Sequence, residues 1–425
     1  MKLIYINTKL PTLFKFIIFI SFIELFFTFL FNLFGYWSFQ IIPYIRLITL
    51  FATTFFFLKN EYINIRLFDL STKINTENIL TLLWLIFSII GFFVGIINGN
   101  PILYLFTDLI YILFGYLLYR IFLSNPSLLS ELKDGLTSQQ EKHFSNIIVL
   151  MAIISFFFHT ELPSFLVVFT LIQSLFFYNK KKYILCFCFL TPFLLQLINS
   201  NRALIIVFIM LLFFAYAQNK FSKKNIKTLL LIAIVICCFF LYFVDDILFI
   251  IIKSLSNQPI LSARLNQIVL IFNGKANWNS PTMLSLKQRL DEVNMVIEFW
   301  LSSPLKFLFG GGMGATIEGY LFKDASVTGA AILGKSAVHN IHVLPFAFIF
   351  RYGFLGVLLF FLLMNNLFKY FLYILLSENS IYKTMIIFQF SWILYSIPAA
   401  SYLWTCPLFW ITLAYISNEK TRTDS

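Results

Sequence analysis

Long apolar runs constrain the fold of this chain more than any other feature. A helix needs roughly 17–25 apolar residues to cross the hydrocarbon core of a bilayer, and runs near that length recur throughout the sequence. We expect spans near residues 11–34, 39–58, 79–97, 101–123, 145–160, 163–178, 182–198, 202–217, 228–249, 350–376, 382–398 and 402–418. The sequence therefore predicts an all-α polytopic membrane protein with about twelve transmembrane helices.

Composition supports this class and argues against a soluble one. Of the 425 residues, 60% are hydrophobic and only 12% are charged, whereas soluble domains carry about twice that charged fraction. The first run, residues 14–34, is too long for the core of a signal peptide and should remain as a span. No linker or repeat marks a second domain, so residues 1–425 are expected to form a single membrane domain.

The distribution of Lys and Arg predicts the orientation of the chain. Basic residues gather in alternate short loops, as the positive-inside rule requires of cytoplasmic loops. Both termini are then cytoplasmic, and residues 250–349 form one large loop on the outer face. The basic residues of that loop are Lys253, Arg264, Lys275, Lys287, Arg289, Lys306, Lys323 and Lys335. Lys and Arg are normally sparse in outer loops, so these residues predict an anionic ligand. The net charge of +12 is explained by the basic loops and does not indicate nucleic-acid binding.

The cysteines predict neither disulfides nor a zinc site. All five lie within apolar stretches and lack the spacing of zinc ligands. No Ser-His-Asp or His-Glu-x-x-His pattern accompanies the histidines, which disfavours a hydrolase or a zinc enzyme. We expect no metal and no cofactor.

An amphipathic helix is expected early in the outer loop. Apolar residues recur at helical spacing from Leu286 to Leu301, ahead of Pro304. Ser285 fits the first position of a capping box, which would place Arg289 in the first helical turn beside positive N-terminal amides. Such an arginine could bind phosphate, or it could pair with Asp291 or Glu292 on a solvated helix face.

Glycines follow this helix in the run Phe309-Gly310-Gly311-Gly312-Met313-Gly314. The run lacks the Gly-Lys-Ser/Thr ending of a nucleotide loop. Gly312 and Gly314 permit unusual backbone angles, which suit either a tight turn or a nest of amides around a phosphate. Both interpretations remain open.

His339 and His342 lie beside the glycine run, and we single out His339 as the candidate base. A neutral imidazole can take a proton from a hydroxyl, although a histidine at a helix mouth is more often structural. Asn340 could orient the ring. We also assign a supporting role at this candidate site to Arg351, near the start of the next span.

Ionisable residues inside or at the mouths of spans need partners. Glu24, Arg46 and Asp108 lie inside predicted spans. A buried pair such as Glu24 with Arg46 is the favoured interpretation over a proton pathway. Arg202, at the outer mouth of a span, could bind an anion or extend its guanidinium to the lipid headgroups.

Together these residues resemble the O-antigen ligase and polymerase superfamily. The resemblance rests on Ser200-Asn201-Arg202-Ala203, on Arg289, on the stretch from Pro304 to Gly314, and on His339-Asn340 followed by Arg351-Tyr352-Gly353-Phe354-Leu355-Gly356. It implies a metal-independent glycosyltransferase of the bacterial inner membrane with a periplasmic active site. It assigns the diphosphate of the donor to Arg202, Arg289 and the less certain Arg264, and the base to His339.

The activity expected from the resemblance is that of an O-antigen polymerase. Such an enzyme moves a glycan from undecaprenyl diphosphate to the terminal sugar of a lipid-linked repeat. Its expected partners are the lipid-linked oligosaccharide and the bilayer, with a chain-length regulator and a flippase, and no nucleic acid. An O-antigen ligase delivering to lipid A-core, a Gram-positive capsule polymerase, and a transporter or flippase are the alternatives.

Overall fold

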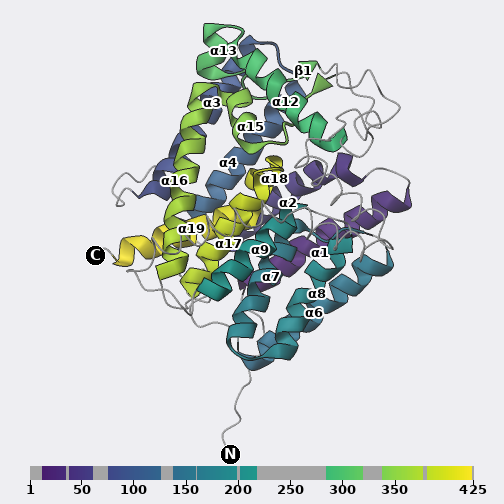
Figure 1. Ribbon diagram of the computed structural model, residues 1–425. Helices are drawn as coiled ribbons and strands as arrows, with labels where there is room; N and C mark the ends of the chain where they lie inside the picture. The colour runs from purple at the N-terminus through teal and green to yellow at the C-terminus, as the bar shows by residue number, and fades with distance from the viewer. Residues whose placement is uncertain are drawn as a thin grey trace, which may run out of the picture.

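The computed structural model describes residues 12–34, 38–60, 75–125, 137–158, 160–198, 202–217, 284–318, 337–376 and 381–423. These residues form fifteen helices and one two-stranded antiparallel sheet. The predicted all-helical fold is therefore confirmed (Figure 1).

The described helices fall into two groups along the chain. The earlier group is α1 (Thr12–Leu33), α2 (Ser38–Asn60), α3 (Thr76–Ile97), α4 (Ile102–Ser124), α6 (Ser138–Phe157), α7 (Ser164–Asn179), α8 (Tyr183–Ile198) and α9 (Arg202–Ala217). The later group is α12 (Leu284–Leu301), α13 (Pro304–Phe309), α15 (Leu344–Tyr352), α16 (Phe354–Leu376), α17 (Ile381–Ser396), α18 (Ser401–Thr405) and α19 (Pro407–Thr423). Strand β1 (Ile317–Glu318) pairs with β2 (Ala337–Val338).

Three helices, α3, α4 and α16, are long and apolar enough to cross a membrane. Shorter apolar helical segments occupy Tyr44–Leu58, Ser164–Asn179, Tyr183–Gln196 and Ala203–Ala215. Helices cover each predicted span that falls within the described residues, whereas the predicted span at 228–249 lies outside them. A multi-pass membrane protein is consistent with these helices.

Two of the predicted spans are interrupted. The expected helix at 350–376 breaks at Gly353, whose φ of 60° ends α15 before α16 begins. Arg351 therefore belongs to the short helix α15 and not to the long one. The expected helix at 402–418 breaks at Cys406, because Pro407 cannot continue the hydrogen bonding of α18 and instead starts α19.

Helix α12 confirms the expected amphipathic helix, with two corrections. It begins at Leu284, so Ser285 is its second residue rather than its cap, and Arg289 lies in the second turn. Its buried side contains Glu292 and Val296, whereas Leu290 and Leu301 are exposed. A carboxylate in the buried side of this helix was not expected.

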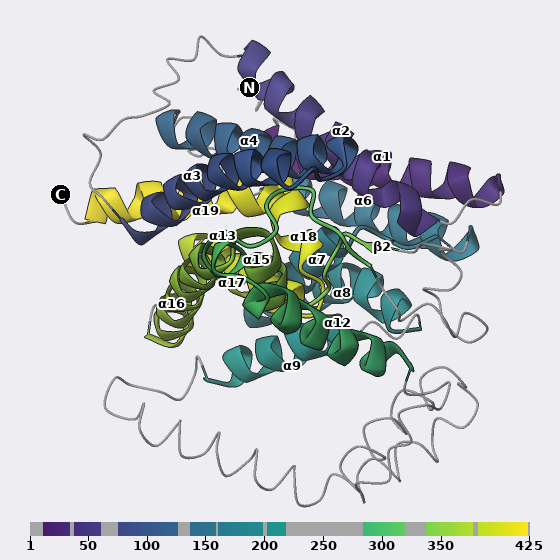
Figure 2. The same cartoon turned by 90° about the horizontal axis from the view of Figure 1, so that it is seen from above.

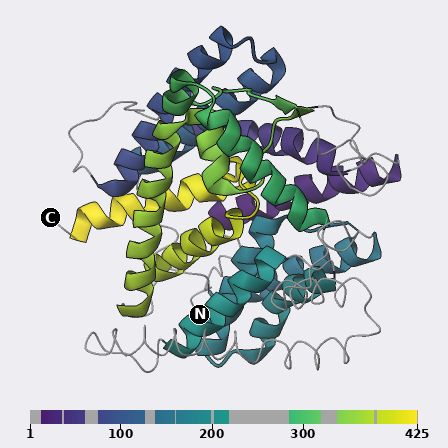
Figure 3. The same ribbon diagram turned by 45° about the horizontal axis from the view of Figure 1, so that its top comes forward.

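Aromatic packing holds the helices that carry the site. The ring of Trp84, on α3, contacts Phe348 of α15, Trp404 of α18 and Trp410 of α19 with centroids 5.3–6.2 Å apart. Buried aromatic rings contribute large apolar areas and fix the geometry of their neighbours. Helix α12 lies beside α15 (Figures 2 and 3). Figure 1 shows α13 and β1 at the same end of the molecule.

The favoured pairing within the spans is also confirmed. The Nη2 and Nε atoms of Arg46 donate to Oε1 of Glu24 at 3.0 and 3.3 Å, joining α2 to α1. Both side chains are largely buried, so each charge has the partner that burial requires.

Candidate functional site

The glycine run packs directly against the hairpin formed by α3 and α4. At Gly312, φ is 78°, and a Cβ would lie 2.4 Å from the backbone nitrogen of Gly95. At Gly314, φ is 71°, and a Cβ would lie 2.5 Å from the backbone nitrogen of Leu105. Only glycine fits both the left-handed backbone and so close an approach.

The amides of this run all bind protein groups. Gly311 and Gly312 donate to the carbonyl oxygens of Phe350 and Arg351, and Met313 donates to that of Gly91. Gly314 donates to Oδ2 of Asp108 at 3.0 Å. The run is thus a tight, packed turn, and a carboxylate of the protein occupies the place where a nest would bind an anion.

Two asparagines of the α3–α4 connection fix the carbonyl groups of the same turn. The side-chain amide of Asn100 donates to the carbonyl oxygens of Gly311 and Met313 at 2.8 and 2.7 Å. Asn98 adds a bond to Gly311 at 3.1 Å. Both the backbone N–H groups and the backbone carbonyl groups of the turn are therefore hydrogen-bonded to neighbouring parts of the protein.

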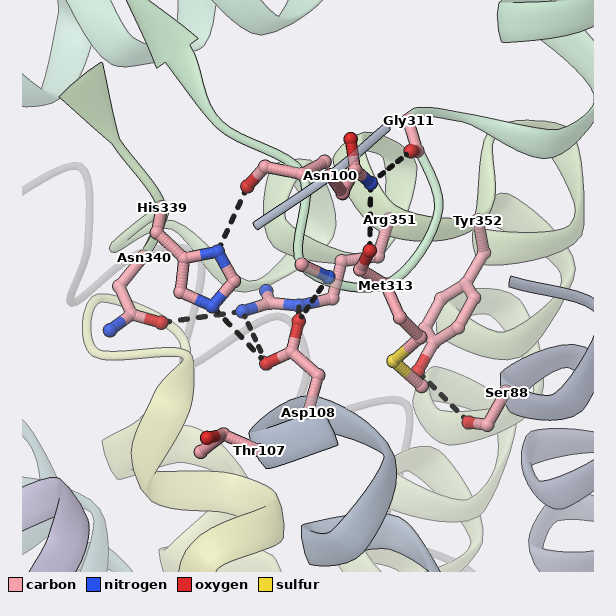
Figure 4. A network of polar contacts seen from close by, with 12 residues as sticks. Ser88, Asn100, Thr107, Asp108, Gly311, Met313, His339, Asn340, Arg351 and Tyr352 are labelled. Carbon is pink, nitrogen blue, oxygen red and sulfur yellow. Dashed lines mark hydrogen bonds and ion pairs between the residues drawn. The ribbon is translucent and has the colours of Figure 1, made fainter. Parts of the chain in front are cut away.

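Asp108 of α4 is the centre of a buried polar network (Figure 4). Its Oδ2 accepts from Nε of Arg351 at 3.0 Å, and its Oδ1 accepts from Nη2 of the same residue at 3.3 Å. Nε2 of His339 lies 3.4 Å from Oδ1. Arg351 also donates to Oδ1 of Asn340 at 3.3 Å. The network joins α4, the glycine turn and α15, and it gathers residues that the sequence analysis singled out separately.

The ring of His339 is held on all sides. Its Nδ1 lies 2.9 Å from the carbonyl oxygen of Ala315, and its face stacks on Tyr104 with centroids 4.4 Å apart. Both ring nitrogens thus face acceptors, because the other faces Asp108. Only the doubly protonated ring can donate to both.

His342 lies in a different environment. Its Nδ1 is 2.8 Å from Oε1 of Glu292, and its backbone N–H donates to Oε2 of the same carboxylate at 3.2 Å. The Glu292 side chain is 1% exposed, whereas that of His342 is 48% exposed. This pair explains why a carboxylate lies in the buried side of α12.

The structure describes the three predicted arginines to different extents. Arg289 is half-buried and precedes Glu292 by three residues, so the two lie on the same side of α12. Arg202 is the first residue of α9, and its side chain lies outside what the structure describes. Arg264 also lies outside the described residues.

Asp108 and Glu292 were not predicted to be members of the site. Asp108 could have been found from its position, since a lone carboxylate in a span needs a cation, and Arg351 was already singled out. Glu292 gave no such signal, because it resembles one member of a solvated charged helix face.

Within the described part of the chain, no group of three or more His, Cys, Asp or Glu residues is arranged to hold a metal ion. No family model, no curated protein and no solved structure matches this chain.

Proposed function

We propose that this protein is a membrane glycosyltransferase that transfers a glycan from a polyprenyl-diphosphate carrier to a sugar hydroxyl, as an O-antigen polymerase does. One observation carries the proposal: the glycine turn, His339, Asn340 and Arg351 gather around Asp108, and α12 with Arg289 lies against the same segment. The glycine turn, His339, Asn340 and Arg351, which carry part of the family resemblance, thus converge in space, although they come from separate parts of the chain.

The chemistry of this transfer requires two protein functions. The bond between the sugar and the diphosphate oxygen breaks, so positive groups must stabilise charge on the departing diphosphate. The acceptor hydroxyl loses a proton as it attacks, so a base must receive that proton. We assign the first function to Arg202, Arg289 and Arg264 and the second to a histidine of the segment 339–342.

The proposed setting is the bacterial inner membrane. About twelve spans, cytoplasmic termini and an outer loop at 250–349 would place the site at the periplasmic surface, where undecaprenyl-diphosphate-linked oligosaccharides present their sugars. The three long apolar helices support this setting. Helix α3 ends and helix α4 begins at the connection that holds the glycine turn.

Deletion of the gene in its native host tests the proposal. The lipopolysaccharide is then resolved on a gel, and complementation with the intact gene serves as the control. A polymerase predicts core carrying a single repeat after deletion. Bare core with accumulated lipid-linked polymer would assign the same chemistry to a ligase. An unchanged ladder would contradict both assignments.

A further inference from the structure

The pairing of Glu292 with His342 fixes which ring nitrogen is free. The buried carboxylate accepts from Nδ1, and its second contact, to the backbone N–H of His342, prevents it from turning away. Nδ1 therefore carries a proton, so that in the neutral ring the lone pair is on Nε2. The ring is half-exposed, and no described residue bonds to Nε2.

This geometry is that of a general base. A carboxylate behind Nδ1 holds the ring in one tautomer and orientation, and it stabilises the imidazolium that forms when Nε2 takes a proton. Because Glu292 is 1% exposed, little water screens its charge from the ring.

His339 also faces a carboxylate, that of Asp108, but neither of its ring nitrogens is left open to a substrate. Its nitrogens face Ala315 and Asp108, its ring stacks on Tyr104, and its side chain is 11% exposed. To take a proton from a substrate hydroxyl, His339 would have to turn one nitrogen away from Ala315 or Asp108.

We propose that His342 is the catalytic base and that Glu292 is its positioning residue, whereas His339 holds the turn in place. The inference rests on the proposed glycosyl transfer. The acceptor hydroxyl passes its proton to Nε2 of His342, and its oxygen forms the new bond to the anomeric carbon. The bond from that carbon to the diphosphate breaks, and its electron pair leaves with the diphosphate.

The place of Arg289 fits this assignment. It lies one turn before Glu292 on the same side of α12. A diphosphate held by Arg289 would leave beside the base that activates the acceptor. One helix would thus supply both the cation for the leaving group and the carboxylate behind the base.

The test uses purified full-length protein in proteoliposomes. The substrate is the lipid-linked repeat extracted from the deletion strain, and the readout is the rate at which longer lipid-linked glycans form. Variants are His342→Gln, Glu292→Gln and the double variant, with His143→Gln on the exposed surface of α6 as the control. Glutamine at position 342 keeps an amide that can still meet Glu292, so the fold is retained.

We expect His342→Gln to lower kcat by about 100-fold or more, with little change in KM. Glu292→Gln should lower kcat less, and the double variant should be no slower than His342→Gln, because Glu292 acts only through the ring. A wild-type rate for His342→Gln, or additive losses in the double variant, would overturn the assignment. Wild-type protein that makes no longer glycan would instead overturn the glycosyl transfer itself.

Chemical rescue distinguishes a catalytic role of His342 from a structural one. Added imidazole should restore glycan extension by His342→Ala, because it can occupy the vacated space and accept the proton. It should not restore extension by His339→Ala. Rescue confined to the His339 variant would return the base to His339.

Discussion

At the scale of single residues, Gly312 offers a direct test of how the site is built. A Cβ there would lie 2.4 Å from the backbone of Gly95, so Gly312→Ala must push the glycine turn away from α3. Gly99 is the matched control, since its φ of 67° is similar but a Cβ there meets no atom within 4 Å. Gly99→Ala should cost about 1–2 kcal/mol from backbone strain alone.

Gly312→Ala should cost about 1–3 kcal/mol more, because the added methyl group also overpacks the contact. The melting temperatures of the two purified variants in one detergent provide the comparison. Equal melting temperatures would show that the turn does not rest on α3 as described.

The chemistry-bearing residues were only partly predictable at this scale. Spacing identified the glycines, His339 and Arg351, since each residue type suits a polar site in an apolar chain. It did not identify their partners. Asp108 is 243 positions from Arg351, and Glu292 is 50 positions from His342. Pairings over such separations depend on how the helices pack, which local pattern does not encode.

At the scale of elements, the contact between α4 and α15 depends on Asp108. Its carboxylate faces Arg351 and His339, and all three side chains are largely buried. Asp108→Asn keeps the shape of the residue but leaves the guanidinium without its counter-charge. Breaking a buried pair in this way costs about 3–5 kcal/mol, so the melting temperature should fall by several degrees.

Glu298→Gln is the control for this change, because Glu298 is exposed on α12. It removes the same formal charge and should leave the melting temperature unchanged. An equal, small effect of both substitutions would mean that Asp108 does not join the two helices.

The helices themselves were predictable because length and hydropathy decide them locally. The predicted ranges overlap the described helices. Apart from the start of α6, which lies at Ser138 and not at 145, the main errors are breaks within two predicted spans. Gly353 divides the helix expected at 350–376, because its positive φ ends α15. On α12, the buried Glu292 pairs with His342, so this position does not follow the apolar pattern that predicted the helix.

At the scale of the whole molecule, the orientation across the bilayer can be tested by labelling. The five native cysteines are first replaced. Single cysteines are then introduced as Glu298→Cys in the predicted outer loop and as Lys181→Cys between α7 and α8. Both positions are exposed. An impermeant maleimide should label position 298 in intact spheroplasts and position 181 only after permeabilisation. The reverse pattern would invert the orientation.

Loop charge predicted this orientation, and the helices alone do not supply it, because a bundle of apolar helices can be inserted either way. The orientation decides which donors the proposed site can meet, since a site on the outer face meets lipid-linked sugars and no nucleotide donors.

The central claim is that the chain itself forms glycosidic bonds from a lipid diphosphate. Its most direct test is to supply purified protein in proteoliposomes with lipid-linked repeats as the only sugar source. We expect a ladder of longer lipid-linked glycans together with release of polyprenyl diphosphate. Repeats that stay at their original length, with no diphosphate released, would contradict it.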